Sequence, residues 1–308
     1  ENRTLTNLPY RSKFTKITGF SLVAVLASNF IMLAVQTFRL ETSPLDVIQT
    51  AFGATWLIRM IITIILLGIW FWMERKPRIS TAKHIPMLLA SLVLIFTTTM
   101  MGHGAATELT APMILDYIHN LLASVWIGGV IFFGFVLLPT LANLKGIQKE
   151  RLTFAILPRY SGMITIALGI LIITGPTLLW FLESNVTSLT NSTYGFLIIA
   201  KILLAIVMIG FGAFYQFKIQ KPAEKNMNFP FKKLAKLLKA EAMVGIALLG
   251  VVALLVNSSL PAGEVQTAEA QGVTLGFSSV LFSEQAKFDV SVIPVGVGPN
   301  TINVMVST

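Results

Sequence analysis

The chain consists mainly of long apolar runs separated by short polar stretches. Seven of these runs come close to the ~20 residues that an α-helix needs to cross a bilayer. Because a backbone surrounded by lipid must satisfy its own hydrogen bonds, such long and uniformly apolar runs predict membrane-spanning helices rather than barrel strands. The predicted helices cover residues 17–38, 50–73, 85–101, 113–139, 161–183, 195–217 and 240–258.

The C-terminal part of the chain has a different pattern. Residues 259–271 form a polar linker, and residues 272–308 alternate apolar and polar side chains, which is typical of β-strands. Since fewer than about forty residues rarely bury a core unaided, this segment is expected to begin a larger domain. The sequence therefore predicts an all-α membrane domain over residues 1–258, followed by part of an extracytoplasmic β-sandwich.

The basic residues are concentrated in alternate connections between the predicted helices. Residues 1–16, 74–84, 141–159 and 218–239 carry 19 of the 23 Lys and Arg residues. By the positive-inside rule, these connections face the cytoplasm, so the N-terminus lies inside and the C-terminus outside the cytoplasmic membrane. The net charge of +9 thus reflects topology in the lipid bilayer and does not indicate nucleic-acid binding. The opposite connections are acidic and would concentrate cations.

Two of the predicted helices begin alike. Gly53 is followed six residues later by Arg59, and Gly195 is followed at the same spacing by Lys201. Both helices run in the same direction, which indicates a parallel duplication of a four-helix unit. The first unit would then lack its opening helix, so eight helices are expected in the parent protein, one of them before Glu1 or supplied by a partner.

Soft and imidazole side chains gather where the third predicted helix ends and the fourth begins. The chain contains no cysteine, so methionine is the soft ligand that is present. Thioether and imidazole groups suit copper, and Cu(I) in particular. Asp116 and His119 are three residues apart and therefore share one helix face. The predicted metal site comprises Met100, Met101, His103, Met113, Asp116 and His119.

Each of these residues also has a purely structural interpretation. Methionine in a membrane helix usually packs, whereas an ionisable group such as His119 is costly inside a span and indicates function. Trp126 would close the site from below or simply pack. Arg59 and Lys201 would either extend to the interface or pair with carboxylates such as Asp116. Because two cations would oppose binding of a third, both are taken as supporting residues and not as ligands.

Signatures of catalysis are absent from the sequence. There is no GxxxxGK[ST] phosphate loop and no HExxH motif, so we expect no catalytic residues and no enzyme activity. Glu241, near the cytoplasmic start of the last predicted helix, is interpreted as a solvated or capping residue, with an inner metal ligand as the alternative.

The assembled residues resemble the copper resistance protein D (CopD-like) family over most of residues 9–262. The resemblance rests on Gly102-His103, on His119 followed by ASVWIGG at 123–129, and on Tyr194-Gly195 with Lys201. It implies an eight-helix domain that moves copper across the cytoplasmic membrane, with His103 and His119 as ligands. It also implies an extracytoplasmic copper-binding β-sandwich, fused or separate. The chain departs from the family pattern at Ala240, where an arginine is usual, and in lacking a helix before Phe14.

Three functions follow from these patterns. The first and preferred one is copper transport, directed inward, with capture at the Met/His site. The second is a membrane electron carrier that binds haem between His103 and His119. The third is a non-transporting subunit or sensor that docks a partner through its outer β region.

Overall fold

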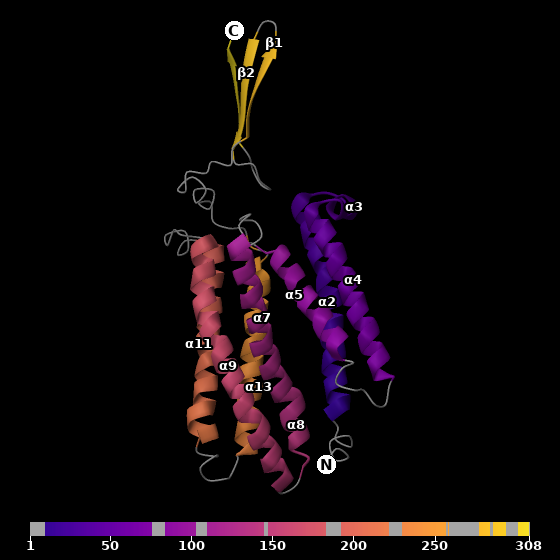
Figure 1. The fold of residues 1–308 in the computed structure, drawn as a ribbon, viewed down its shortest axis with the longest axis vertical. Coiled ribbons are helices and arrows are strands. Elements are labelled where there is room, and N and C mark those ends of the chain that lie inside the picture. The colour runs from indigo at the N-terminus through magenta and orange to yellow at the C-terminus, as the bar shows by residue number, and fades with distance from the viewer. Residues whose placement is uncertain are drawn as a thin grey trace.

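The computed structural model describes residues 10–75, 84–102, 110–144, 147–182, 192–221, 230–256, 258, 277–283, 286–293 and 301–307. Up to residue 256 these residues are almost entirely helical, and the long helices run alternately in opposite directions (Figure 1). The helices are α2 (Tyr10–Leu40), α3 (Pro44–Ile48), α4 (Ala51–Glu74), α5 (Ile85–Met100), α7 (Thr110–Phe132), α8 (Leu138–Leu141), α9 (Ile147–Leu182), α11 (Thr193–Tyr215) and α13 (Phe231–Val256), with the π-helical segments η2 (Phe133–Leu137) and η3 (Gln216–Gln220).

Six helical stretches in the described part of the chain are long and apolar enough to cross a membrane. They are Ser12–Leu40, Ala51–Glu74, Thr110–Leu141, Leu152–Phe181, Thr193–Gln220 and Lys233–Val256. The third predicted helix is present as α5, which is apolar but has only 16 residues. The protein is therefore a multi-pass helical membrane protein, while the count of eight helices in the parent stays a prediction.

Two helices extend well beyond the apolar runs that predicted them. Helix α9 begins at Ile147 rather than near residue 161, and α13 begins at Phe231 rather than near residue 240. Both extensions carry basic residues. Hydrophobicity marks the lipid-facing part of a helix, but the backbone hydrogen bonds continue into the polar region beyond it. Part of the predicted cytoplasmic connections is thus helical.

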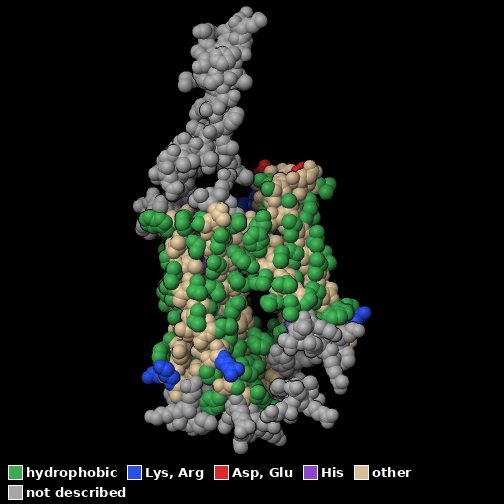
Figure 2. Space-filling model, viewed as in Figure 1, with side chains coloured by type: hydrophobic (Ala, Val, Ile, Leu, Met, Phe, Trp, Pro, Cys, Tyr) green, Lys and Arg blue, Asp and Glu red, His purple; other side chains and the backbone are tan. Residues whose placement is uncertain are grey.

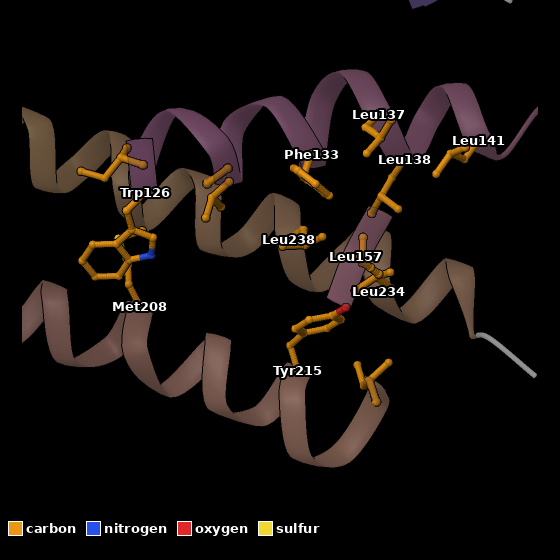
Figure 3. Packing of buried hydrophobic residues seen from close by; sticks show 14 of the residues in the cluster. Trp126, Phe133, Leu137, Leu138, Leu141, Leu157, Met208, Tyr215, Leu234 and Leu238 are labelled. Atoms are coloured by element: carbon orange, nitrogen blue, oxygen red, sulfur yellow. The ribbon is translucent and has the colours of Figure 1, made fainter. Parts of the chain in front are cut away.

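The helices form two groups. Helices α2 and α5 both contact α4, and α7, α9, α11 and α13 form a larger group, with α5 leading from one group to the other (Figure 1). The main apolar core lies in the second group, where Trp126 faces Met208 at one end (Figure 3). The buried core residues are Trp126, Ile127, Val130, Phe133, Leu137, Leu138, Leu141, Leu157, Leu171, Met208, Tyr215, Ile219, Leu234, Leu238, Ala242 and Leu248.

The surface of the helical part is divided into an apolar middle and polar ends. Apolar side chains cover the middle. Basic side chains lie at the end of the helices where the N-terminus is found, and acidic ones lie near α3 at the opposite end (Figure 2). Large side chains such as Phe20 and Ile166 are 77% and 69% exposed. Such surface is costly in water but is satisfied by lipid tails.

Helices α4 and α11 start with the same cap. The Thr50 hydroxyl accepts a hydrogen bond from the Gly53 N–H (3.2 Å), and the Ser192 hydroxyl accepts one from the Gly195 N–H (3.1 Å). A side-chain oxygen at this position satisfies one of the free N–H groups of a helix start. The duplicated four-helix unit stays a prediction, and these matched caps are a structural observation that supports it.

The C-terminal strands form one antiparallel sheet in the order β1-β2-β3. Strand β1 covers Phe277–Ser283, β2 covers Ala286–Ile293 and β3 covers Thr301–Ser307. The register pairs Val280 with Asp289 and Val290 with Val304. A single sheet of this size does not make a sandwich, so the predicted β-sandwich domain remains a prediction.

Replacing Gly129 by alanine is expected to lower the free energy of unfolding by about 1–3 kcal/mol. A Cβ atom on Gly129 would overlap the Tyr160 hydroxyl, so the ring that stacks on Phe133 would have to move. The neighbouring Gly128 provides a matched control, because a Cβ there meets nothing within 4 Å. Thermal unfolding in detergent should therefore separate Gly129→Ala from Gly128→Ala, and equal midpoints would contradict this packing.

Candidate metal site at the ends of helices α5 and α7

The candidate site lies where α5 ends and α7 begins. Helix α5 ends at Met100, and Gly102 is the last described residue before His103, which lies outside the described residues. A Cβ atom on Gly102 would lie 3.6 Å from Asp116 Oδ2 on α7. The chain therefore passes directly beside Asp116 immediately before His103.

Asp116 is held by a hydrogen-bonded link between α7 and α5. Asn120, one turn further along α7, donates its side-chain amide to Asp116 Oδ2 (2.9 Å) and to the Thr99 hydroxyl of α5 (3.3 Å). Pairing with an amide and a hydroxyl reduces the cost of placing a carboxylate among apolar helices. This link fixes the carboxylate oxygens at the end of the helix group where α5 ends and α7 begins.

His119 points toward α9. Its Nδ1 lies 2.9 Å from the hydroxyl oxygen of Thr174, which is 4% exposed. The Thr174 hydroxyl can donate to the Leu171 carbonyl (3.4 Å), which leaves its oxygen free to accept from Nδ1–H. In that tautomer Nε2 carries the lone pair that a metal would bind. The imidazole also packs beside Gly175 of α9, where a Cβ atom would lie in ordinary van der Waals contact with His119 Cε1 (3.7 Å).

Lys201 of α11 is the cation of this site. Its ammonium group interacts electrostatically with both Asp116 and His119. Lys201 therefore lies within electrostatic range of the Asp116 carboxylate, while its pairing with this carboxylate stays a prediction. Residues from α7 and α11 are thus brought together, and α9 contributes Thr174.

The methionines lie around this cluster in different environments. Met100 is 44% exposed, and Met101 forms the C-cap of α5. Met113 is partly buried, one turn before Asp116 on α7. Among the described residues, no group of three or more His, Cys, Asp or Glu side chains could hold a metal ion. A complete ligand set at this place therefore needs thioethers or His103.

Arg59 belongs to a separate polar network within the first helix group. Its guanidinium donates to Asn29 Oδ1 of α2 (2.7 Å). It also donates to three acceptors on α5, which are the Leu94 carbonyl and the hydroxyls of Thr97 and Thr98. Asn29 also donates to Thr63 of α4 (3.0 Å). Arg59 thus joins α4 to α2 and α5 and does not face the candidate site.

Trp126 lies deeper in the molecule than the candidate site. It is 5% exposed and belongs to the apolar core, where it faces Met208 (Figure 3). Its carbonyl accepts a hydrogen bond from the Tyr160 hydroxyl (3.5 Å). A position in the apolar core is that of a packing residue, which is one of the two roles that the sequence allowed for Trp126.

Several polar residues of these networks were missed in the sequence. They are uncharged and lie within mainly apolar runs: Asn29, the triplet Thr97-Thr98-Thr99, and Asn120. The signal that points to them is the cost of a polar group inside a span, which applies to amides and hydroxyls as well as to charges.

Glu241 differs from the sequence interpretation. The side chain is 4% exposed, within the membrane-spanning stretch of α13. The expectation of a solvated residue is therefore wrong, because α13 begins earlier than predicted and carries Glu241 into the helix group.

Comparison with known proteins gives matches along most of the chain. A family model described as Copper resistance protein D matches residues 154–255, and one described as Copper resistance protein D-like, N-terminal domain, matches residues 4–113. The Copper transport protein CutJ of Bacillus subtilis (strain 168) is 26% identical over 216 residues, which are 69% of this chain and 37% of that protein. Copper resistance protein D of Pseudomonas syringae pv. tomato is 24% identical over 239 residues, 74% of this chain and 75% of that protein. No solved structure matches.

Proposed function

Since the chain belongs to the copper resistance protein D family, we propose that it transports copper across the cytoplasmic membrane, in the inward direction. The names of both relatives, a copper transport protein and a copper resistance protein, support copper as the cargo. The chain spans 37% of the length of the Bacillus relative, so segments outside it would contribute to a whole transporter.

The observation that carries the proposal is the setting of His119. An imidazole inside a membrane helix is costly unless it has a role, and here Thr174 holds one ring nitrogen. The other nitrogen is then free for a ligand. With Asp116 on the same face of α7 and Lys201 nearby, the site has an imidazole to bind a cation and charges that tune its affinity.

The remaining ligands that we propose are His103, Met100, Met101 and Met113, with Asp116 as an oxygen ligand or as a hydrogen-bond acceptor. Thioether and imidazole ligands favour Cu(I) over divalent ions. Lys201 would oppose a bound cation and so keep the affinity low enough for release. This balance suits a site through which copper passes.

The topology proposed here has the N-terminal end of α2 in the cytoplasm and the sheet β1–β3 outside. The basic end of the helices and the acidic residues near α3 support this orientation (Figure 2). In it, the candidate site lies toward the extracytoplasmic side, where copper would arrive. The strands would belong to a copper-binding β-sandwich domain that delivers copper to the site.

Copper uptake by purified protein in liposomes tests the proposal. Wild-type protein is expected to bind copper and accumulate it in the liposomes, and His103→Ala combined with His119→Ala is expected to abolish both. Uptake that is unchanged in the double variant would contradict this site. A visible spectrum of the same samples tests haem binding, because a Soret band at one haem per chain would favour an electron carrier.

Replacing Thr174 by valine is expected to weaken copper binding by about 10- to 100-fold, the usual effect of removing the hydrogen-bond partner of a metal-bound histidine. Valine has the same shape as threonine but offers His119 Nδ1 no oxygen. Isothermal titration with Cu(I) in a competing chelator measures the change.

Thr177→Val is the matched control, because Thr177 lies on the same helix, is less buried than Thr174, and donates to the Ile173 carbonyl of its own helix. This variant is expected to bind copper like the wild type. Equal affinities for all three proteins would show that the Thr174 hydroxyl does not orient a copper ligand.

A further inference from the structure

Glu241 is a buried carboxyl group that the proposed copper site does not use. It lies on α13 within the membrane-spanning stretch Lys233–Val256 and is 4% exposed. Its neighbours Leu238 and Ala242 on the same helix are also buried, whereas Lys239 is exposed. The carboxyl group therefore faces the inside of the second helix group.

The elements packed against α13 surround this position mainly with apolar side chains. Helix α7 and η2 contribute Ile127, Val130 and Phe133, and α11 contributes Met208. The backbone of η2 comes close, because a Cβ atom on Gly134 would lie 3.2 Å from the Leu238 carbonyl oxygen. Tight apolar packing of this kind leaves little room for water.

Two phenols are the other ionisable groups of this core among the described residues. Tyr160 of α9 lies within electrostatic range of Glu241, and Tyr215 belongs to α11. Both are neutral at pH 7. The lysines nearest on α13 and η3 that the structure describes, Lys236, Lys239 and Lys218, are exposed.

In these surroundings, burying a carboxyl group costs much less free energy as the neutral acid than as the carboxylate. The charged form would need a cation or several hydrogen-bond donors, and the groups just described offer no cation inside the core. Ionisable residues within membrane helices commonly mark proton or ion paths. Tyr160, within electrostatic range of Glu241, donates its hydroxyl to the Trp126 carbonyl of α7.

We propose that Glu241 is a proton-binding site in the inner half of the second helix group and that its proton is exchanged for copper. The exchange rests on the proposed transport function. When Cu(I) enters this half from the outer side, the carboxyl O–H bond breaks, the proton leaves to water on the outer side, and the carboxylate neutralises the copper ion. When copper leaves on the inner side, the carboxylate takes a proton from water on that side. No electron is transferred, and the charge in the helix group stays constant.

Infrared difference spectroscopy of the full chain in liposomes tests the proton site without copper. Between acidic and alkaline buffer, the wild type is expected to show the C=O stretch of a carboxylic acid that loses its proton, and Glu241→Gln is expected to lose this band. Glu241→Asp keeps an acid and should show the band with a shifted frequency and midpoint. A band that Glu241→Gln leaves unchanged, or no such band in the wild type, overturns the proposal.

Glu74→Gln is the matched control, because this substitution makes the same side-chain change at an exposed position at the end of α4. This variant is expected to keep the band. Its loss in both variants would overturn the assignment to Glu241.

A pH-sensitive dye inside the liposomes tests the exchange itself. Wild-type protein is expected to move protons outward as copper enters, and Glu241→Gln is expected to lose the proton signal. Copper uptake with an unchanged proton signal in Glu241→Gln overturns the exchange. If the wild type takes up no copper at all, the proposed transport is wrong, while the infrared measurement still decides the proton site.

Discussion

Replacing Arg59 by methionine is expected to lower the free energy of unfolding by about 4 kcal/mol, the usual cost of removing one partner of a buried charged interaction. The guanidinium links Asn29 of α2 with Thr97 and Thr98 of α5, so its removal takes a hydrogen-bond donor from acceptor oxygens on both helices. Thermal or denaturant unfolding in detergent measures the loss. We expect the first helix group to separate before the second.

Two further variants decide whether the geometry of Arg59 matters or only its charge. Arg59→Lys keeps the charge but cannot donate in several directions at once, so it should recover only part of the stability. Arg39→Met removes an exposed arginine at the end of α2 and should change the unfolding midpoint little. If Arg39→Met costs as much as Arg59→Met, the network around Arg59 is not the reason.

Methionine in place of Lys201 is expected to destabilise the protein by about 3 kcal/mol, because Asp116 would lose the cation that compensates its charge. The effect is smaller than that of Arg59→Met, since the hydrogen bond from Asn120 remains. Combining Lys201→Met with Asp116→Asn should restore most of the stability, because neither buried charge is left alone.

The double-mutant cycle of Lys201 and Asp116 therefore has a definite sign. The two single substitutions should each destabilise, and the double one should cost less than their sum. Additive losses, measured by the same unfolding experiment, would mean that the two side chains do not interact. Copper titration of the single variant Lys201→Met, which keeps Asp116, should also show whether Lys201 tunes the affinity of the site.

Much of the helical part could be predicted from hydrophobicity alone, because a lipid-facing backbone must satisfy its own hydrogen bonds and a long apolar run does so as a helix. The junction of α5 and α7 is one example, since the predicted helices end at residue 101 and resume at residue 113, while α5 ends at Met100 and α7 begins at Thr110. The first residues of the helices were harder to predict. The extension of α9 to Ile147 is polar, so the apolar pattern does not extend to it.

The partners of individual side chains could not be predicted in the same way. Arg59 and Lys201 occupy equivalent places after a glycine, yet one binds Asn29 and two threonines while the other lies near Asp116. Spacing along a helix indicates which face a residue occupies. It does not say which neighbour covers that face, because this depends on the contacts of all the other helices.

The same limit explains His119. Its three-residue spacing from Asp116 predicted a shared helix face, but gave no sign of a partner on another helix. In the structure its Nδ1 lies beside the Thr174 hydroxyl of α9. A helix face is broad enough for Asp116 to contact α5 through Asn120 while His119, one turn further, contacts α9.

The shortness of α5 has a consequence for the surrounding lipid. Sixteen residues at 1.5 Å each span about 24 Å, less than the ~30 Å hydrocarbon thickness of a typical bilayer. Helix α5 also runs obliquely to its neighbours, which shortens its reach further (Figure 1). Such hydrophobic mismatch thins the bilayer locally or draws water and headgroups inward. Met100, Met101 and Asp116 would then lie at the base of a dimple in the membrane surface, and lipids with longer tails would deepen their burial.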